Sequence, residues 1–409
     1  MKPYHLFQAY GVELEYMIVR KNDLQVLPIS DTLMERVAGH ITDEIKRKDI
    51  SWSNELVLHV IELKTAVPSP GLDGLQHKFA EAIKEINELL EEDEAMLMPT
   101  AMHPLMNPDR DMKLWPHGNR EIYAAYDRIF NCKGHGWANL QSVHLNLPFH
   151  GDAEFARLHT AIRLLLPILP ALAASSPIME GHLSGLRDTR LQVYKSNQAV
   201  VPQIAGKVIP EPVQSAEEYH KVIFQPMYDA IASDDPDGIL QEEWLNSRGA
   251  IARFDRNAIE IRVLDIQECP AADLAILQVI CAVLKELCSE NISAYETQLK
   301  PETGQLLTAL NSVIEKGEDA IITERNFLNA LGLKSKPVKA GNVWKELLNK
   351  VSITAEAREK LDFILTHGTL SARITRALQE GSGEAAIRKV YGHLAGCLKH
   401  NKMFLPESV

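Results

Sequence analysis

The segment YGVELEYMIV, residues 10–19, contains two glutamates, Glu13 and Glu15, in a pattern that predicts a β-strand. Successive side chains of a strand point to opposite faces, so both carboxylates lie on one face and apolar side chains lie on the other. Glutamate is depleted in strands, and like charges two residues apart repel each other. For this strand alone, exposure of the polar face to water is the simpler explanation.

Three further segments, 56–67, 142–149 and 257–265, also predict strands with polar residues at their centres or ends. A sheet face that only contacts water is usually rich in Thr, Lys, Ser and Gln. If the four strands are neighbours, four carboxylates and one imidazole meet on one concave surface. The polar positions of the three segments are Glu62 and Lys64, then Ser142, His144 and Asn146, then Glu260 and Arg262.

Such a cluster requires cations, because carboxylates that lie close together repel each other. Oxygen ligands with a single imidazole suit Mg²⁺ or Mn²⁺ better than zinc, which favours sulfur and nitrogen. Arg262 lies two residues from Glu260 and offers a planar donor fork to an oxyanion such as phosphate. The predicted metal ligands are Glu13, Glu15, Glu62, His144 and Glu260.

The elements that must position these residues alternate between strand and helix in the first part of the chain, and the last part is almost entirely helical. The segment 198–215 contains three prolines and predicts a long loop of the kind that borders an active site or a partner surface. Apolar periodicity predicts helices over residues 72–92, 153–175, 271–288, 303–316, 355–366 and 383–400.

The composition indicates a soluble globular protein of 409 residues, 45% hydrophobic and 24% charged. A formal net charge of −12 argues against a surface that binds nucleic acid. The five cysteines form no CxxC pair, and no secretory signal precedes them, so we expect a cytoplasmic protein. The apolar stretch 164–179 is interrupted by two prolines and is short for a membrane span. The oligomeric state stays open.

Six short motifs together resemble the second family of glutamate–cysteine ligases, which are carboxylate–amine ligases related to glutamine synthetase. They occur in the family's order between about residues 10 and 270, and the chain after about residue 290 matches more weakly. The motifs are GVELE at 11–15, VIELKT at 60–65, MHP at 102–104, QSVHLN at 141–146, ALAASSPIMEG at 171–181 and AIEIRVLD at 258–265.

The resemblance implies an α+β, glutamine synthetase-like fold, in which a curved, mainly antiparallel sheet forms a funnel and helices cover its outer face. It implies a catalytic domain over residues 1–290 and a helical C-terminal region over 291–409 that packs on this domain. ATP and two or more Mg²⁺ ions are the implied cofactors, and amino acids are the implied substrates.

Carried over by motif, Glu13, Glu15, Glu62 and Glu260 are implied metal ligands, and Arg262 is implied to face the transferred phosphoryl group. Arg190, in GLRDTRLQVY, is a second candidate for contact with phosphate or a substrate carboxylate, although a surface ion pair explains it nearly as well. Both roles, a contact with phosphate or substrate and a surface ion pair, are kept for Arg190 at this point.

One motif departs from the family. The family usually has His-Val-His where this chain has Ser142-Val143-His144, so His144 and Ser142 are the expected contacts to cofactor and the occupancy of one metal site is in doubt. His103 precedes Pro104 and has a structural explanation as well, and Glu55 is an additional carboxylate near the second strand.

The expected reaction is ATP-dependent amide formation, with an acyl phosphate as intermediate and a γ-glutamyl amide as the product. The family name suggests cysteine as the amine, but no sequence feature identifies a thiol pocket. Two alternatives remain: a guanidino phosphotransferase of the same fold, and a catalytically weak ATP-binding regulatory protein, which Ser142 favours. A metal-dependent amidase is less favoured, because no HExxH motif or nucleophile elbow is present.

Overall fold

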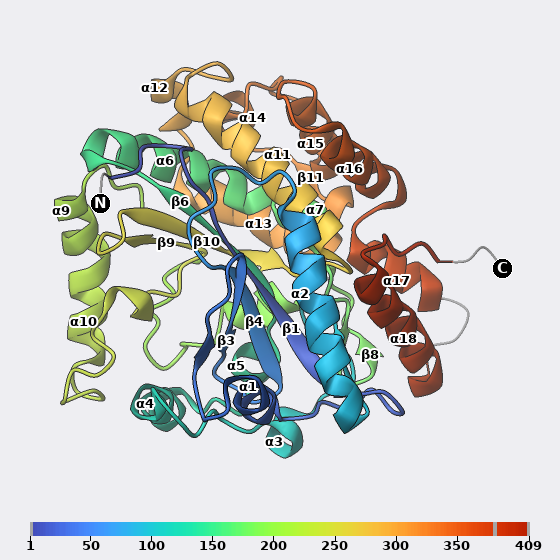
Figure 1. Cartoon of the computed structure of the whole chain (residues 1–409). Coiled ribbons are helices and arrows are strands. Elements are labelled where there is room, and N and C mark those ends of the chain that lie inside the picture. Colours follow the sequence, from blue (N-terminus) through green and yellow to red (C-terminus); the bar gives the residue numbers. More distant parts are fainter. Residues whose placement is uncertain (1–2, 379–382, 407–409) are drawn as a thin grey trace.

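An eight-stranded antiparallel sheet forms the centre of the computed structural model, which describes residues 3–378 and 383–406 (Figure 1). The strand order is β2-β3-β4-β1-β6-β10-β9, and β5 pairs with the far half of β1. The strands are β1 (Gly11–Arg20), β2 (Glu44–Ile45), β3 (Ile50–Asn54), β4 (Val60–Thr65), β5 (Ala95–Met98), β6 (Ser142–Pro148), β9 (Ala250–Arg253) and β10 (Ala258–Asp265).

The four strands predicted from the sequence are direct neighbours, in the order β4-β1-β6-β10. Glu15 lies opposite Glu62 across β1 and β4, and Glu13 lies opposite His144 across β1 and β6. The predicted strand over 56–67 is shorter in the structure, because residues 56–58 form backbone hydrogen bonds with residues 113–115 instead. The α+β, mainly antiparallel fold is confirmed.

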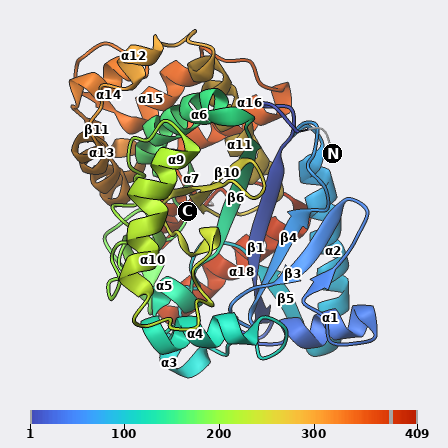
Figure 2. The ribbon, with the colours of Figure 1, turned by 90° about the vertical axis from the view of Figure 1, so that its left-hand side faces the viewer.

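Helices cover the apolar face of the sheet. The apolar positions of β1 belong to one buried cluster with Phe79 and Ile83 of α2 (Leu75–Leu90) and with the apolar side of α11 (Pro270–Cys288). In Figure 2, α2 lies on one side of β1, β3 and β4, and α4 (Arg120–Phe130) and α10 (Gln225–Ile231) lie on the other. The apolar face is therefore covered by α2 and α11, and the polar face lies toward α4 and α10.

The remaining predicted helices are present, but one is interrupted. The segment 153–175 divides into α6 (Gly151–Leu165), a short 3-10 turn and α7 (Pro170–Ala173). Pro167 and Pro170 lack the N–H that a continuous helix requires, which explains the division. The C-terminal helices match closely: α13 (Thr303–Lys316), α16 (Ala355–His367) and α18 (Glu384–His400).

Several elements were not predicted from the sequence. They include β2 and β3 at one edge of the sheet, β9 at the other edge, β5 beside β1, α4 beside the polar face, and α10. The others are α1 (Ser30–Ala38), α3 (Pro108–Asp111), α5 (His135–Ala138), α8 (Thr189–Tyr194), α9 (Ala216–Tyr219), α12 (Tyr295–Gln298), α14 (Arg325–Ala330), α15 (Ala340–Leu348), α17 (Leu370–Leu378), β7 (Ile178–Met179), β8 (His182–Leu183), β11 (Ile321–Ile322) and β12 (Val338–Lys339).

The C-terminal helices share the core of the sheet. One buried cluster extends from Val12 of β1 to Leu361 of α16, and α18 packs on α2 and β5. The division into domains at residue 290 stays a prediction. Within residues 3–378 and 383–406, no helix has both the length and the apolar character needed to cross a membrane.

Candidate functional site

The polar faces of the four central strands bring the five predicted residues with ionisable side chains together, and Glu55 joins them from the segment between β3 and β4. We call this group the acidic cluster: Glu13, Glu15, Glu55, Glu62, His144 and Glu260. Most of these side chains are buried or nearly so.

Two sets of three side chains in the acidic cluster have ligand atoms within 4.8 Å of one another. Glu13, Glu62 and His144 form the first set, and Glu15, Glu55 and Glu62 form the second. Glu62 belongs to both, so its carboxylate lies between the two places where an ion fits. Glu260, the fifth predicted ligand, lies beside these sets rather than in them.

His144 is held by hydrogen bonds at both ring nitrogens. Its Nδ1 lies 2.9 Å from Glu13 Oε2, and its Nε2 lies 2.9 Å from Ser142 Oγ. Burial lowers the pKa of His144, but the bond to Glu13 and the charges of Glu15 and Glu260 outweigh it and raise the pKa to about 9. The imidazole is therefore protonated on both nitrogens and positively charged at neutral pH in the metal-free protein. A metal ion that binds one ring nitrogen must displace the proton from it.

Glu13 is fixed on both sides. Asn146 Nδ2 donates to its Oε1 at 3.1 Å, while His144 holds its Oε2. Burial raises the pKa of Glu13, but His144, Lys64 and Arg262 reverse this and lower the pKa to about 2. The carboxylate is therefore ionised at neutral pH and available as a ligand.

Ser142, the position that departs from the family, orients Glu15. Its backbone N–H donates to Glu15 Oε2 at 2.7 Å and its hydroxyl donates to the same oxygen at 3.1 Å. The same hydroxyl contacts His144. The serine thus has a local structural role, and its predicted contact with cofactor stays a prediction.

Glu62 and Glu55 show the strain of like charges. Burial and then Glu13 raise the pKa of Glu62 to about 7, against the opposing effects of Lys64 and Ser53. Burial, Glu15 and Glu62 raise the pKa of Glu55 well above its usual value. A bound cation lowers the repulsion between such carboxylates. Oxygen donors with one imidazole match the ligand preference of Mg²⁺ or Mn²⁺. The residues present therefore fit divalent ions.

Arg262 borders the acidic cluster on β10. Its Nε and Nη2 lie 3.0 and 2.8 Å from Glu260 Oε1, which holds the guanidinium in place. Burial lowers the pKa of Arg262, but Glu260 and then Tyr194 outweigh this and keep it above its usual value. Its Nη1 has no partner among the described residues, so it can donate to an oxyanion.

Two other predicted positions have structural partners. Arg190 is buried, not on the surface, and its Nε donates to Asp265 Oδ1 at 2.5 Å. Its Nη2 has no hydrogen-bond partner among the described residues, so its predicted contact with a substrate stays a prediction. His103 donates from Nε2 to Leu24 O at 2.6 Å and accepts from Leu105 N–H, which accounts for it structurally.

The sequence reasoning missed two tyrosines next to Arg262. Tyr126 of α4 and Tyr194 of α8 are both close enough to Arg262 to affect its pKa. Ile122, Tyr126 and Phe130 follow helical spacing, so α4 could have been predicted from periodicity. No sequence signal connects Tyr194 with β10.

Comparisons with known proteins agree with this architecture. A family model described as glutamate–cysteine ligase family 2 matches residues 9–393. An uncharacterized protein from Archaeoglobus fulgidus is 36% identical over 400 residues, which cover 97% of this chain and 100% of that protein. The crystal structure of a glutamate–cysteine ligase from Francisella tularensis in complex with AMP aligns with a TM-score of 0.58 at 12% identity, over 97% of this chain and 89% of that one. At this identity, the structural likeness shows the fold alone.

Proposed function

The chain belongs to glutamate–cysteine ligase family 2, and on that premise we propose that it is an ATP- and Mg²⁺-dependent ligase that joins a carboxylate to an amine. The observation that carries the proposal is the pair of ligand sets that share Glu62, with Arg262 close by. A ligase of this type needs cations and a guanidinium around the transferred phosphoryl group. The AMP in the related crystal structure supports a nucleotide as the second substrate.

The residues that would hold divalent ions are Glu13, Glu62 and His144 in one set and Glu15, Glu55 and Glu62 in the other. When bound, the ions would neutralise phosphate charge. Asn146 and Ser142 keep two of the carboxylates in fixed orientations. Such preorganisation lowers the cost of reaching the transition state.

In the proposed reaction, a substrate carboxylate oxygen attacks the γ-phosphorus of ATP, and ADP leaves with the bonding electron pair. The acyl phosphate then reacts with an amine, the amine loses a proton, and phosphate leaves. Arg262 offsets the negative charge on the transferred phosphoryl group through Nη1. Its other donors are held by Glu260, so the guanidinium has a fixed position before substrate binds.

We propose glutamate as the carboxylate substrate and cysteine as the first amine to test, because the family name specifies this pair. The protein is proposed to act in the cytoplasm, which the five buried cysteines support: all lie in the described part of the chain and none forms a disulfide.

The test incubates the purified protein with ATP, Mg²⁺ and pools of amino acids, and follows ADP, free phosphate and new masses together. The proposal predicts ADP and free phosphate in equal amounts with a new mass equal to both amino acids minus water. Glu62→Gln should lose this activity, and Glu44→Gln, on β2 and outside both ligand sets, should keep it. ADP with a phosphorylated guanidine instead of free phosphate would indicate a phosphotransferase. Nucleotide binding without ADP release would indicate a regulatory protein.

A further inference from the structure

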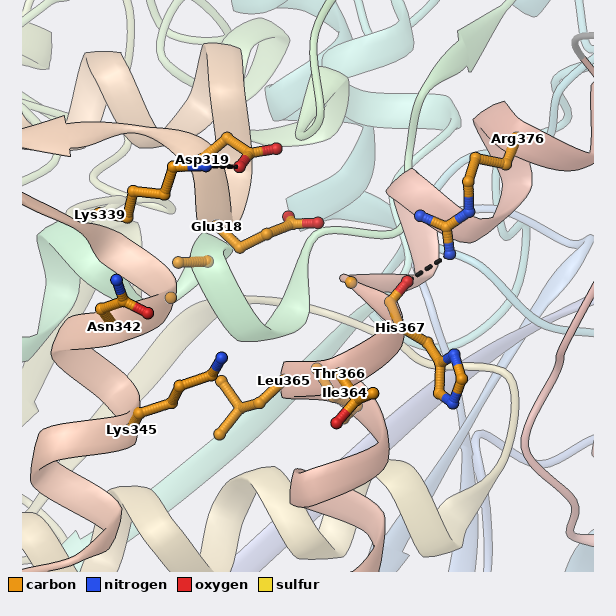
Figure 3. A pocket seen from close by; sticks show the side chains of 13 residues that line it. Glu318, Asp319, Lys339, Asn342, Lys345, Ile364, Leu365, Thr366, His367 and Arg376 are labelled. Carbon is orange, nitrogen blue, oxygen red and sulfur yellow. Dashed lines mark hydrogen bonds and ion pairs between the residues drawn. The ribbon is translucent and has the colours of Figure 1, made fainter.

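A cavity of about 700 Å³ lies in the C-terminal helical part of the chain (Figure 3). Its walls come from the short turn Gly317–Asp319, the first half of α15, the end of α16 with Gly368, and Arg376 in the last turn of α17. Ala171, Ile364 and Leu365 give it an apolar side. No residue of the acidic cluster lines it, and its volume falls in the range of small-molecule sites, about 300–1,000 Å³.

The acidic side chains of this cavity already have partners. Asp319 Oδ1 accepts from Lys339 Nζ at 2.8 Å. Glu318 accepts from the Thr369 hydroxyl at 3.0 Å and from the Thr369 backbone N–H at 3.3 Å. The lysine–aspartate pair is neutral, whereas Glu318 is oriented by an uncharged threonine and keeps its negative charge.

Two further cations, Lys345 and Arg376, line the cavity against this single carboxylate. Among the described residues, neither Lys345 nor Arg376 forms an ion pair, and the Lys345 ammonium has no hydrogen bond. Arg376 donates only to the backbone carbonyl of His367. Figure 3 shows the two side chains on opposite sides of the cavity, so each presents unused donors to the space between them.

The turn between α16 and α17 brings Arg376 close to this space. Gly368 has φ +86°, a conformation that L side chains rarely adopt, and a Cβ there would lie 2.5 Å from Glu318 Oε1 and 3.5 Å from Arg376 Nη1. A side chain at this position would fill the approach to the guanidinium. The glycine therefore keeps this end of the cavity open.

We propose that this cavity binds a small molecule with two anionic groups, phosphates or carboxylates, one held by Lys345 and the other by Arg376. Asn342, at the same wall as Lys345, adds an amide that donates and accepts hydrogen bonds. The ligand's body lies against the apolar side. This site is separate from the proposed ligase chemistry.

The test uses isothermal titration calorimetry on the full chain at low ionic strength with a chelator present, so that no metal ion contributes. Pyrophosphate and glutarate are the two probes, and acetate is the probe with a single anionic group. Lys345→Gln and Arg376→Gln should each weaken binding of the better probe about tenfold or more, because each removes the positive charge that pairs with one anionic group of the probe. Lys339→Gln is the matched control, because that lysine lines the cavity but is already paired with Asp319, and it should change binding less than about threefold.

Tight binding of pyrophosphate alone would identify a phosphorylated ligand, and binding of glutarate would identify a dicarboxylate; either result supports the proposal. Circular dichroism and melting curves check that each variant is folded, and Lys345→Gln, at an exposed helix position, is the decisive one. Three results would overturn the proposal: no binding of either probe, equal binding of acetate, or binding that Lys345→Gln leaves unchanged. A failed ligase assay would not affect this result, because the titration requires no turnover.

Discussion

Glu62→Gln should make the metal-free protein more stable and at the same time abolish its response to divalent ions. Glu62 lies within 4.8 Å of other carboxylates in both ligand sets. A pair of like charges at this distance costs about 3 kcal/mol at an effective dielectric constant of about 20. Lys64 Nζ, 3.5 Å away, offsets part of this repulsion.

The pKa of Glu62 gives the net size of the effect. Its value of about 7 in the folded protein lies above its usual 4.5, so the ionised carboxylate destabilises the fold at pH values above that range. The destabilisation is absent below pH 4.5 and complete above about pH 7, and its size is about 3 kcal/mol at 1.36 kcal/mol per pKa unit. For a chain of 409 residues this corresponds to a rise in melting temperature of about 3–4 °C at pH 8.

Divalent metal ions should reverse the order of stability of wild type and Glu62→Gln. A single ion at 100 times its dissociation constant stabilises the native state by about 2.7 kcal/mol, and the wild-type chain has two ligand sets where Glu62→Gln has neither complete. Differential scanning calorimetry at pH 8, with chelator and with excess Mn²⁺, measures both effects. Glu44→Gln removes another carboxylate near Lys64 and should respond to Mn²⁺ like the wild type. The reasoning is refuted if Glu62→Gln melts below wild type in chelator, or if Mn²⁺ stabilises both proteins equally.

Three further changes have defined outcomes. Arg262→Ala should lower turnover about 10³-fold while the chain still folds, since the guanidinium acts on the transferred phosphoryl group. Steady-state ADP release measures turnover and circular dichroism checks folding, and turnover within tenfold of wild type argues against the role. Arg373→Met should lower the free energy of unfolding, measured in urea, by about 3–5 kcal/mol, because it leaves Glu268 as an unpaired buried charge. The double variant with Glu268→Gln should recover most of the lost stability, and equal losses in both variants would contradict the pairing. Burial lowers the pKa of His159 to about 3, so only the unfolded chain takes up a proton there as the pH falls below 6.5. Between pH 7.5 and pH 5.5, His159→Phe should therefore lose about 1.4 kcal/mol less stability than wild type in urea titrations, and equal losses would contradict a neutral buried histidine.

Side-chain alternation was enough to place Glu13 and Glu15 on one face, because the period of a strand is fixed by its backbone. The alternation does not show that the strands with Glu62 and His144 flank β1, or that the strand with Glu260 follows next in the sheet. Strand order depends on packing between segments far apart in the chain, and only the family resemblance provided it before the structure.

Other features lie beyond any local pattern. Glu55 lies in the segment between β3 and β4, where neither helical nor strand periodicity applies, so its sequence position did not assign it to a ligand set. Arg190 pairs with Asp265, 75 residues away, and sequence alone does not distinguish a buried ion pair from a substrate contact. The cavity between Lys345 and Arg376 likewise combines residues from separate helices with no shared motif.

Anomalous diffraction from crystals grown with Mn²⁺ and a non-hydrolysable ATP analogue would locate the two divalent ions that we propose for the acidic cluster. We expect one anomalous peak among Glu13, Glu62 and His144 and a second among Glu15, Glu55 and Glu62. Peaks found only at exposed carboxylates elsewhere, or an analogue bound with no manganese at the acidic cluster, would contradict this proposal.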